Sequence, residues 1–189
     1  MKTILFPLLR NVIILIFFFS LKSFAQVFYG ITTKGGADGV GTIFKYDNNT
    51  SEITSVPSFK KQAFGANPYY TELVEYQGKI YGMTHNGGKS NLGVIFEWDP
   101  VTNAYTKKID FNGLNGKNPY GDLILFNNKF YGTTSKGGAN DMGVIFEWDP
   151  VTNIYIKKMD FDYNSGYEPL SSFILFNNRL YCMTSRGGT

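Results

Sequence analysis

An eleven-residue stretch, GVIFEWDPVTN, occurs at residues 93–103 and again without a change at 143–153. The repetition extends beyond it, because residues 71–120 and 121–170 align without a gap and are identical at about half of their positions. Self-similarity with a period of about 50 residues indicates a repeat architecture, in which each unit buries one face against the next. This repeat constrains the fold more than any other feature of the chain.

Each repeat contains four segments with the composition of β-strands. In one unit they are DLILF (122–126), KFYGTTS (129–135), GVIFEW (143–148) and IYIKKMDF (154–161). The Asn and Gly residues between them tolerate the positive φ of tight turns. The third segment is apolar throughout its first half, as in a strand covered on both faces, and the lysines of the fourth suit an exposed outer edge. Four antiparallel strands per repeat predict one blade of a β-propeller.

We therefore predict an all-β fold, a β-propeller-like array of four-stranded antiparallel blades with about 50 residues per repeat. The expected units cover residues 27–69, 70–119, 120–169 and 170–189, which make about three and a half blades. Closed propellers usually have about 4–8 blades, so we expect residues 26–189 to be a partial propeller from a longer reading frame. Its unpaired apolar strands should then make the isolated segment aggregate or self-associate.

Residues 1–25 have the layout of a secretory signal peptide. Lys2 and Arg10 precede an apolar stretch centred on residues 12–19. Ser23 and Ala25 then occupy the −3 and −1 positions of a cleavage site. An uncleaved membrane anchor is the alternative, but the apolar run is shorter than the roughly 20 residues that a bilayer requires. We expect a protein that is secreted or on the outer cell surface, with membrane contact only through this leader or through a C-terminal anchor in a missing part.

Removing the leader changes the charge balance. The chain has 18 Lys and Arg against 15 Asp and Glu, and the leader holds Lys2, Arg10 and Lys22 but no acid, so 15 basic residues face 15 acidic ones in the remainder. This balance argues against nucleic-acid binding, because phosphate recognition needs clustered positive charge.

The single cysteine, Cys182, excludes an internal disulfide. It stands where the other units have glycine, so we expect a small residue packed in a sheet rather than a reactive thiol.

The segment YGTTSKGGANDMGVIFEWD (131–149) resembles the Gloeo/Verruco tandem repeat, a kelch-like family of exported bacterial proteins. Two features carry the resemblance: a tyrosine followed by a double Gly in all four units, and GxIF in three of them. The positions are Tyr29, Tyr81, Tyr131 and Tyr181 for the first, and 41–44, 93–96 and 143–146 for the second. The aromatic spacing differs from kelch proper. The resemblance implies an extracellular or surface-attached propeller with no established reaction.

No catalytic residue is predicted. His85 is the only histidine, and no serine lies in a nucleophile-elbow context. Acids recur at fixed positions of the repeat: Asp47, Asp99 and Asp149, then Glu97 and Glu147, then Asp110 and Asp160. A catalytic carboxylate pair should break the symmetry between units, so we interpret these acids as turn-capping or strand-edge residues. A carbohydrate-active enzyme, or the propeller part of one, remains the alternative function.

No metal ion or cofactor is predicted either. The loops 35–41, 87–93 and 137–143 could offer oxygen ligands to calcium from Asp38, Asn91, Asn140 and Asp141. These positions do not form a constant ligand set, and one loop carries Lys89 instead. No helix follows the glycines, as a dinucleotide-binding fingerprint would require.

The favoured function is a non-enzymatic binding or adhesion propeller, with a glycan or protein as ligand. The double-Gly loops and the links between blades should emerge on one face, and they vary while the opposite turns are constant. Variable loops on a constant scaffold usually carry recognition. The candidate ligand-binding residues are Lys34, His85, Asn86, Lys136 and Arg186. Aromatic residues, 17% of the chain, would suit a sugar or a peptide where they are exposed. Structural packing within a larger surface protein is the third option.

Overall fold

The computed structural model describes residues 27–59 and 64–189, and within these ranges the chain consists of strands and turns. The predicted leader, 1–25, lies outside the described residues. The strands are β1 (Val27–Thr32), β2 (Thr42–Asp47), β3 (Glu52–Ser58), β4 (Val74–Tyr76), β5 (Lys79–Thr84), β6 (Val94–Asp99), β7 (Ala104–Asp110), β8 (Lys117–Pro119), β9 (Ile124–Phe126), β10 (Lys129–Lys136), β11 (Val144–Trp148), β12 (Tyr155–Asp160), β13 (Tyr167–Pro169), β14 (Ile174–Phe176), β15 (Arg179–Tyr181) and β16 (Thr184–Arg186). Among the described residues, no helix of the length and apolarity of a membrane span occurs.

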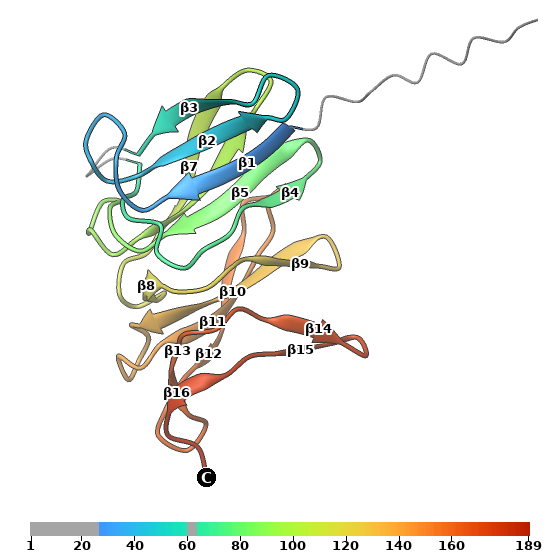
Figure 1. The fold of residues 1–189 in the computed structure, drawn as a ribbon. Coiled ribbons are helices and arrows are strands. Elements are labelled where there is room, and N and C mark those ends of the chain that lie inside the picture. Colours follow the sequence, from blue (N-terminus) through green and yellow to red (C-terminus); the bar gives the residue numbers. More distant parts are fainter. Residues whose placement is uncertain (1–26, 60–63) are drawn as a thin grey trace, which may run out of the picture.

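The strands form successive antiparallel sheets in chain order. Blade 1 is β1-β2-β3, and blade 2 is β4-β5-β6-β7. Blade 3 is β12-β11-β10-β8 with β9 also paired to β10, and blade 4 consists of the pairs β13-β16 and β14-β15. Figure 1 shows these sheets stacked from the blue end of the chain to the red end. The predicted all-β array of antiparallel blades, an incomplete propeller, is confirmed.

The inner strand of blade 3 is made of two pieces that pair with the two ends of β10. β9 pairs with its beginning, through Lys129↔Phe126, and β8 pairs with its end, through Thr134↔Pro119. Residues 112–120 and 162–170, which belong to the links between blades, thus contain the short strands β8 and β13, which the sequence analysis did not predict. Both short strands end in a proline, which donates no ladder hydrogen bond and obscures the strand pattern.

The four strands predicted in the third unit are present, with their ends trimmed by one or two residues or, for β10, extended by one. Their register explains one glycine of the repeat. Gly132 of β10 lies opposite Phe146 of β11, and a Cβ on Gly132 would lie 2.5 Å from Phe146 Cζ. Gly82 stands in the same relation to Phe96 in blade 2. The aromatic ring of the third strand thus covers a bare backbone position of the second.

The hydrophobic core lies between blades rather than within them. One cluster joins blades 1 and 2 and includes Ile43, Phe96 and Trp98; another joins blades 2 and 3. The same contact recurs at both junctions, because Tyr29 lies 5.1 Å from Trp98 and Tyr81 lies 5.7 Å from Trp148 between ring centroids. Burying each such side chain contributes about 1.5–3 kcal/mol. The repeated sequence is therefore a repeated inter-blade contact.

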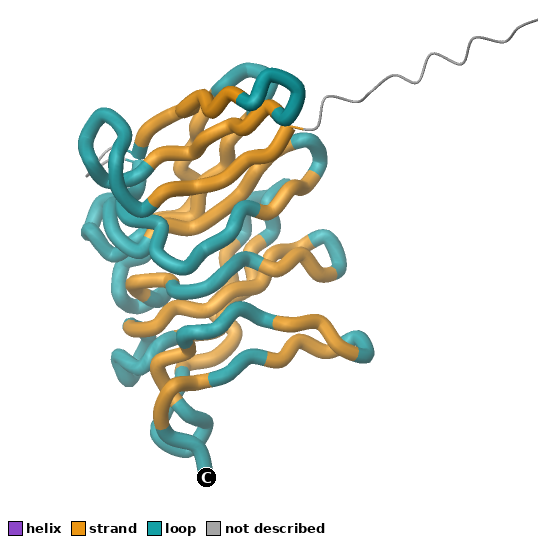
Figure 2. The backbone as a smooth tube through the Cα atoms, in the orientation of Figure 1, coloured by secondary structure: helices purple, strands orange, loops and turns teal. Residues whose placement is uncertain are grey.

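The loops lie at the two ends of the strands (Figure 2). One end, the double-Gly face, consists of the loops 33–41, 85–93, 137–143 and 187–189 with the links 64–68, 112–118 and 162–168. Backbone hydrogen bonds join loop to link, as from Ala66 N to Asn86 O at 2.8 Å and from Gly138 N to Gly113 O at 2.8 Å. The other end, the hairpin face, consists of the turns 47–52, 76–79, 99–104, 126–129, 149–154 and 176–179.

Candidate functional site

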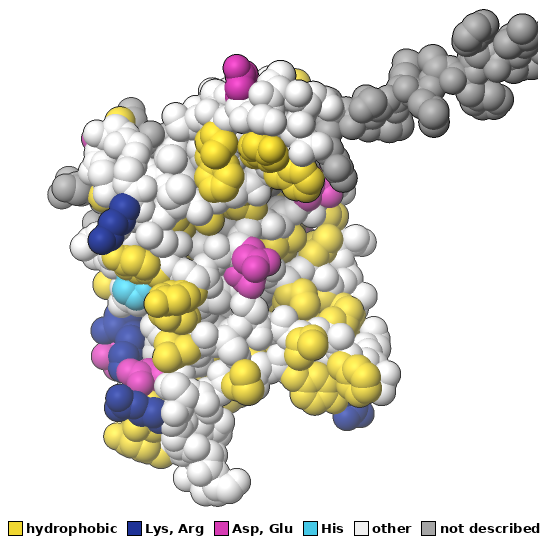
Figure 3. All heavy atoms as spheres, viewed as in Figure 1, with side chains coloured by type: hydrophobic (Ala, Val, Ile, Leu, Met, Phe, Trp, Pro, Cys, Tyr) yellow, Lys and Arg dark blue, Asp and Glu magenta, His cyan; other side chains and the backbone are white. Residues whose placement is uncertain are grey.

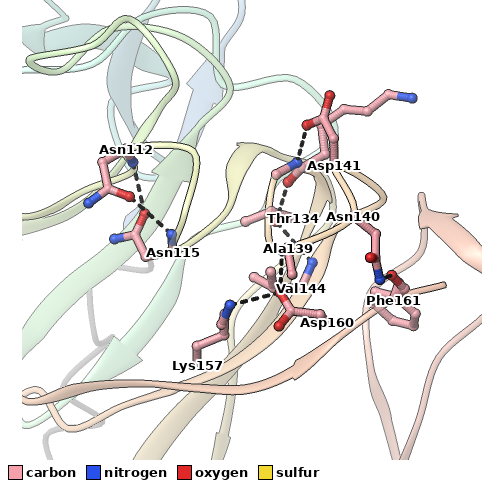
Figure 4. A network of polar contacts seen from close by, with 12 residues as sticks. Asn112, Asn115, Thr134, Ala139, Asn140, Asp141, Val144, Lys157, Asp160 and Phe161 are labelled. Atoms are coloured by element: carbon pink, nitrogen blue, oxygen red, sulfur yellow. Dashed lines mark hydrogen bonds and ion pairs between the residues drawn. The ribbon is translucent and has the colours of Figure 1, made fainter.

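The double-Gly loops are fixed by their own polar side chains. In blade 3, Gly137 and Gly138 have φ of 83° and 79°, so the chain turns where side chains would be strained. The Gly137 amide donates to Asp141 Oδ1 at 2.9 Å, and the Ala139 amide donates to Asp160 Oδ1 at 2.8 Å. Figure 4 shows this loop with both carboxylates directed toward the backbone. The Gly137 and Ala139 amides of this loop are thus already hydrogen-bonded to carboxylates of the same blade.

Two of the side-chain oxygens that were considered for calcium, those of Asn91 and Asp141, accept hydrogen bonds from loop amides. Asn91 accepts from the Gly87 amide at 2.9 Å, as Asp141 does in the next blade. Asn140 donates to Phe161 O at 2.9 Å. The hydrogen bond from Lys117 lowers the pKa of Asp141, and burial raises it. The hydrogen bond from the Gly137 amide also lowers this pKa. Within residues 27–59 and 64–189, no three His, Cys, Asp or Glu side chains gather as metal ligands.

Most of the predicted site residues fall into two groups on the double-Gly face. His85 and Asn86 belong to a cluster where blades 1, 2 and 3 meet. Lys136 and Arg186 belong to a cluster between blades 3 and 4. Lys34 is exposed and lies in neither group; among the described residues its ammonium makes no ion pair.

The first cluster is a chain of amide hydrogen bonds across the blades. Asn67 Nδ2 donates to Thr33 O at 3.2 Å, and Asn86 Nδ2 donates to Asn67 Oδ1 at 3.3 Å. Asn118 Nδ2 donates to His85 O at 3.1 Å, while His85 Nδ1 lies 2.9 Å from Asn86 Oδ1. All of these Asn and His residues are half-buried, so their remaining hydrogen-bonding capacity is in reach of solvent.

The second cluster is centred on a carboxylate. Glu168 forms ion pairs with Lys136 and with Arg186. The Nε of Arg186 lies 3.1 Å from Glu168 Oε2. The hydrogen bond from Lys136 lowers the pKa of Glu168, while burial opposes it. Arg186 stays exposed, so its guanidinium keeps donors that a ligand can use.

Sequence reasoning missed the residues that hold both clusters together. Asn67, Asn118 and Glu168 occupy one position of the repeat, each with a left-handed φ of 51°, 52° and 54°. Their amides donate to the preceding blade, at Val40 O, Leu92 O and Met142 O. Each precedes a proline, and this polar residue before proline in three units is the signal that could have found them.

Aromatic rings flank the first cluster. Tyr69 meets the His85 ring edge-on at 5.5 Å. Tyr70 stacks on Tyr120 of the next blade at 4.5 Å, and 70% of Tyr70 is exposed. Amides beside an exposed ring can bind a ligand that has both hydroxyl groups and an apolar face.

The acids that recur in the repeat have structural partners. Asp149 accepts from the amides of Val151 and Thr152 at 2.8 and 3.1 Å, as Asp99 does in blade 2. Glu147 is buried and accepts from Lys129 at 2.5 Å and from Tyr131 at 2.9 Å. Glu97 accepts in the same way from Lys79 at 2.7 Å and from Tyr81 at 3.0 Å.

Two cavities lie away from the predicted residues. One of about 270 Å³ lies between blades 1 and 2 and is lined by Tyr29, Gly30, Ile31, Thr71, Glu72 and Leu73. One of about 190 Å³ opens at the hairpin face and is lined by Tyr76, Gln77, Lys79, Tyr81, Pro150 and Val151. A third, of about 260 Å³, is lined by Leu170, Ser171, Met183, Thr184 and Ser185, next to Arg186 in the chain. None of the predicted site residues lines any of these three cavities.

Comparison with known proteins identifies the repeat. The sequence profile of the Gloeobacter/Verrucomicrobia repeat matches residues 18–189. No curated protein matches the chain.

The solved structures that match this chain include the following three. TolB from Acinetobacter baumannii is 18% identical, with 79% of this chain and 33% of that chain covered and a TM-score of 0.47. The tricorn protease is 9% identical, with 85% and 20% covered and a TM-score of 0.39. A proposed 6-phosphogluconolactonase from Bacteroides uniformis is 11% identical, with 85% and 54% covered and a TM-score of 0.43. The chain thus spans a third or less of the first two proteins and about half of the third.

Proposed function

The chain belongs to the Gloeobacter/Verrucomicrobia repeat family, and from this premise we propose that it is an exported, non-enzymatic binding module of the propeller type. Its ligand meets the double-Gly face. One observation carries the proposal: polar side chains that differ between units converge on this face, over a backbone that the units share. Loops that vary on a constant scaffold usually carry recognition.

The side chains of the first cluster favour a glycan as the ligand. The amides of Asn67, Asn86 and Asn118 both donate and accept hydrogen bonds, which matches sugar hydroxyl groups. The exposed ring of Tyr70 offers an apolar platform at small entropy cost. Arg186 adds a charged donor at the adjoining junction.

The acids that recur in the repeat are already hydrogen-bonded within the protein, which supports a binding function over glycosidase activity. A glycosidase needs one carboxylic acid and one carboxylate facing the same substrate bond. Here Asp99 and Asp149 hold turns at the hairpin face, and Glu147 is tied to Lys129 and Tyr131. These partners leave the carboxylates of the repeat occupied.

Export is supported by the layout of residues 1–25. The family match begins at residue 18, inside this leader. N-terminal sequencing or intact mass of protein recovered outside the cell should give Gln26, or its cyclised form, as the first residue. Recovery of a cytoplasmic product that retains Met1 contradicts export.

The binding proposal is tested with two variants of the full chain on a glycan array. Replacing Asn86, Lys136 and Arg186 together by Ala should reduce glycan signals at least about tenfold, because a few central residues carry most binding energy. The control replaces Val101 and Val151, exposed apolar residues of the hairpin face, by Ala, and should bind as the parent does. Equal loss in the control at unchanged melting temperature contradicts the assignment of the face. Turnover of chromogenic glycosides contradicts the non-enzymatic role.

A further inference from the structure

A small cavity opens at the hairpin face where blades 2 and 3 meet. Its volume is about 190 Å³, and its walls come from these two blades alone. Both blades have their full set of strands, so the first and last blades play no part in the cavity. Typical small-molecule sites measure about 300–1,000 Å³, so this one suits a single residue of a longer ligand. The lining residues are Tyr76, Gln77, Lys79 and Tyr81 of blade 2 with Pro150 and Val151 of blade 3.

The turn that forms one wall departs from the repeat. Blades 3 and 4 have Phe-Asn-Asn at residues 126–128 and 176–178, whereas blade 2 has Tyr76, Gln77 and Gly78. The other lining residues are the same in blades 2 and 3. Blade 2 thus carries an additional hydroxyl group and a longer amide on a scaffold that the repeat otherwise keeps. Loop residues that vary on a rigid scaffold are where recognition usually lies.

The polar groups of this wall mainly donate hydrogen bonds. Gln77 Nε2 donates to the Tyr76 hydroxyl at 3.0 Å, so this hydroxyl keeps its own proton for a ligand. Lys79 donates to Glu97 at 2.7 Å, and 41% of its side chain is exposed, so its ammonium has further donors in reach of solvent. Tyr81 directs its proton to Glu97 at 3.0 Å. A ligand in the cavity therefore needs a hydrogen-bond acceptor on the side of blade 2.

The opposite wall is apolar and rigid. Pro150 and Val151 belong to a turn that is held by Asp149, which accepts from the Val151 amide at 2.8 Å. Val151 is 72% exposed. The Tyr76 ring is fixed beside this wall by an edge-on contact with Phe130 of blade 3 at 6.0 Å. Figure 3 shows hydrophobic side chains on the right of the molecule, where the hairpins β4–β5 and β14–β15 lie, whereas Lys and Arg gather mainly on the left.

We propose that this cavity binds an extended, proline-containing segment of a partner protein, with one prolyl residue inside it. A prolyl residue has a carbonyl acceptor but no N–H, which matches the donors of Tyr76 and Lys79. Its compact apolar ring suits the surface of Pro150 and Val151. Proline-rich segments are already extended as polyproline II helices, so a shallow groove with aromatic side chains binds them at small entropy cost. The cavity lies away from the double-Gly face, so the inference is independent of the proposed function.

The test measures binding of a fluorescein-labelled decaproline peptide to the full chain by fluorescence anisotropy. A Gly-Ser peptide of the same length is the reference ligand, because it has the carbonyl groups without the rings or the preformed helix. The wild type should bind decaproline saturably and the Gly-Ser peptide at least about tenfold more weakly, since the flexible chain must be ordered on binding.

One variant disables the donor wall by giving blade 2 the turn of blade 3, through Tyr76→Phe, Gln77→Asn and Gly78→Asn. The backbone accepts this turn, because Asn127 and Asn128 have φ of 51° and 60°, while Gln77 and Gly78 have 53° and 75°. The variant should keep its melting temperature and bind decaproline at least about tenfold more weakly, because a few central residues carry most binding energy. Tyr76→Phe alone, which removes a single oxygen atom, should show part of this loss.

A second variant, Val151→Lys, places a charge in the apolar wall and should also weaken binding at least about tenfold. Its matched control is Val101→Lys, in the identical turn of blade 2, which does not line this cavity. The two valines are 72% and 89% exposed, so both variants should fold. Replacing Asn86, Lys136 and Arg186 together by Ala should leave decaproline binding unchanged, because these residues lie on the other face.

Four results would each overturn the proposal. They are equal affinity of the wild type for the two peptides, no saturable binding of decaproline at millimolar concentration, an unchanged affinity of the turn variant, and the same loss in Val101→Lys as in Val151→Lys. Loss of decaproline binding in the variant of the double-Gly face would also contradict it, because the peptide would then bind at that face.

Discussion

At the scale of single residues, the buried glutamate of each complete blade links the second, third and fourth strands. In blade 3, Glu147 accepts from Lys129 and Tyr131 of β10 and from Lys158 of β12 at 3.3 Å. Lys129 and Lys158 keep 40% and 46% of their side chains in solvent, so each ion pair alone contributes little. The carboxylate matters more, because it is buried and its partners converge on it.

Replacing Glu147 by Gln should therefore lower stability. The lysines can be hydrated, but the Tyr131 hydroxyl loses its charged acceptor, so a loss of about 1–2 kcal/mol is expected. Urea melts followed by tryptophan fluorescence measure it. Glu147→Ala, which also removes the packing of the stem, should be less stable than Glu147→Gln. Equal stability of the Gln variant and the wild type would contradict a structural role for the carboxylate.

The same carboxylate predicts how stability depends on pH. The Lys129 hydrogen bond lowers the pKa of Glu147 from its usual 4.5, with burial opposing. A group whose pKa is lower in the folded state stabilises the fold above its unfolded pKa, and this contribution is lost as the pH falls through the folded pKa. Melting temperatures should therefore fall less steeply below about pH 4.5 in Glu147→Gln than in the wild type. Parallel curves would show that Glu147 is not the titrating group.

Gly132 gives a second prediction at this scale. A methyl group there would lie 2.5 Å from the Phe146 ring, so Gly132→Ala should cost about 1–3 kcal/mol through overpacking. The cost should shrink in a Phe146→Leu background, because the two sites share one space. Calorimetry of the two single variants and the double variant measures the coupling. The same cost in both backgrounds would place the strain elsewhere. Cys182 occupies the equivalent position in blade 4, where it is half-buried and burial raises the pKa of its thiol.

At the scale of elements, the sequence predicted strands better than links. The segments that became β9 to β12 were recognisable because each alternates or clusters apolar residues between Asn, Gly and Pro turns. β8 and β13 were not, because three residues that end in proline carry no period. The candidate site was predictable only in part: the loop positions follow from the repeat, but the convergence of Asn67, Asn86 and Asn118 depends on how neighbouring blades pack.

The DPVTN turn supports a prediction about its last residue. Asn153 has a φ of 58°, and its Oδ1 accepts a hydrogen bond from the Trp148 indole at 3.1 Å. Asn153→Gly keeps the backbone but leaves the buried indole without this partner, at about 1 kcal/mol. Asn153→Ala should cost about 1–2 kcal/mol more, because Ala is strained at positive φ. Urea melts rank the variants, with Val151→Ala as a neutral control. Equal losses for Gly and Ala would mean that the left-handed backbone is not maintained.

At the scale of the whole molecule, stability should be graded along the stack of blades. A blade that is packed on both faces opens less readily than one that is packed on one. Phe96 and Trp98 of blade 2 are fully or almost fully buried, and so are Phe146 and Trp148 of blade 3. In blade 4, by contrast, Ile174 and Phe176 are more than half exposed, and among the described strands β14 and β15 pair only with each other.

Hydrogen exchange of the native protein should follow this gradient. Amides of β5, β6, β10 and β11 should exchange slowest, and those of β14 and β15 fastest, because the latter open without disturbing an inter-blade core. Uniform exchange over all four blades would contradict the gradient.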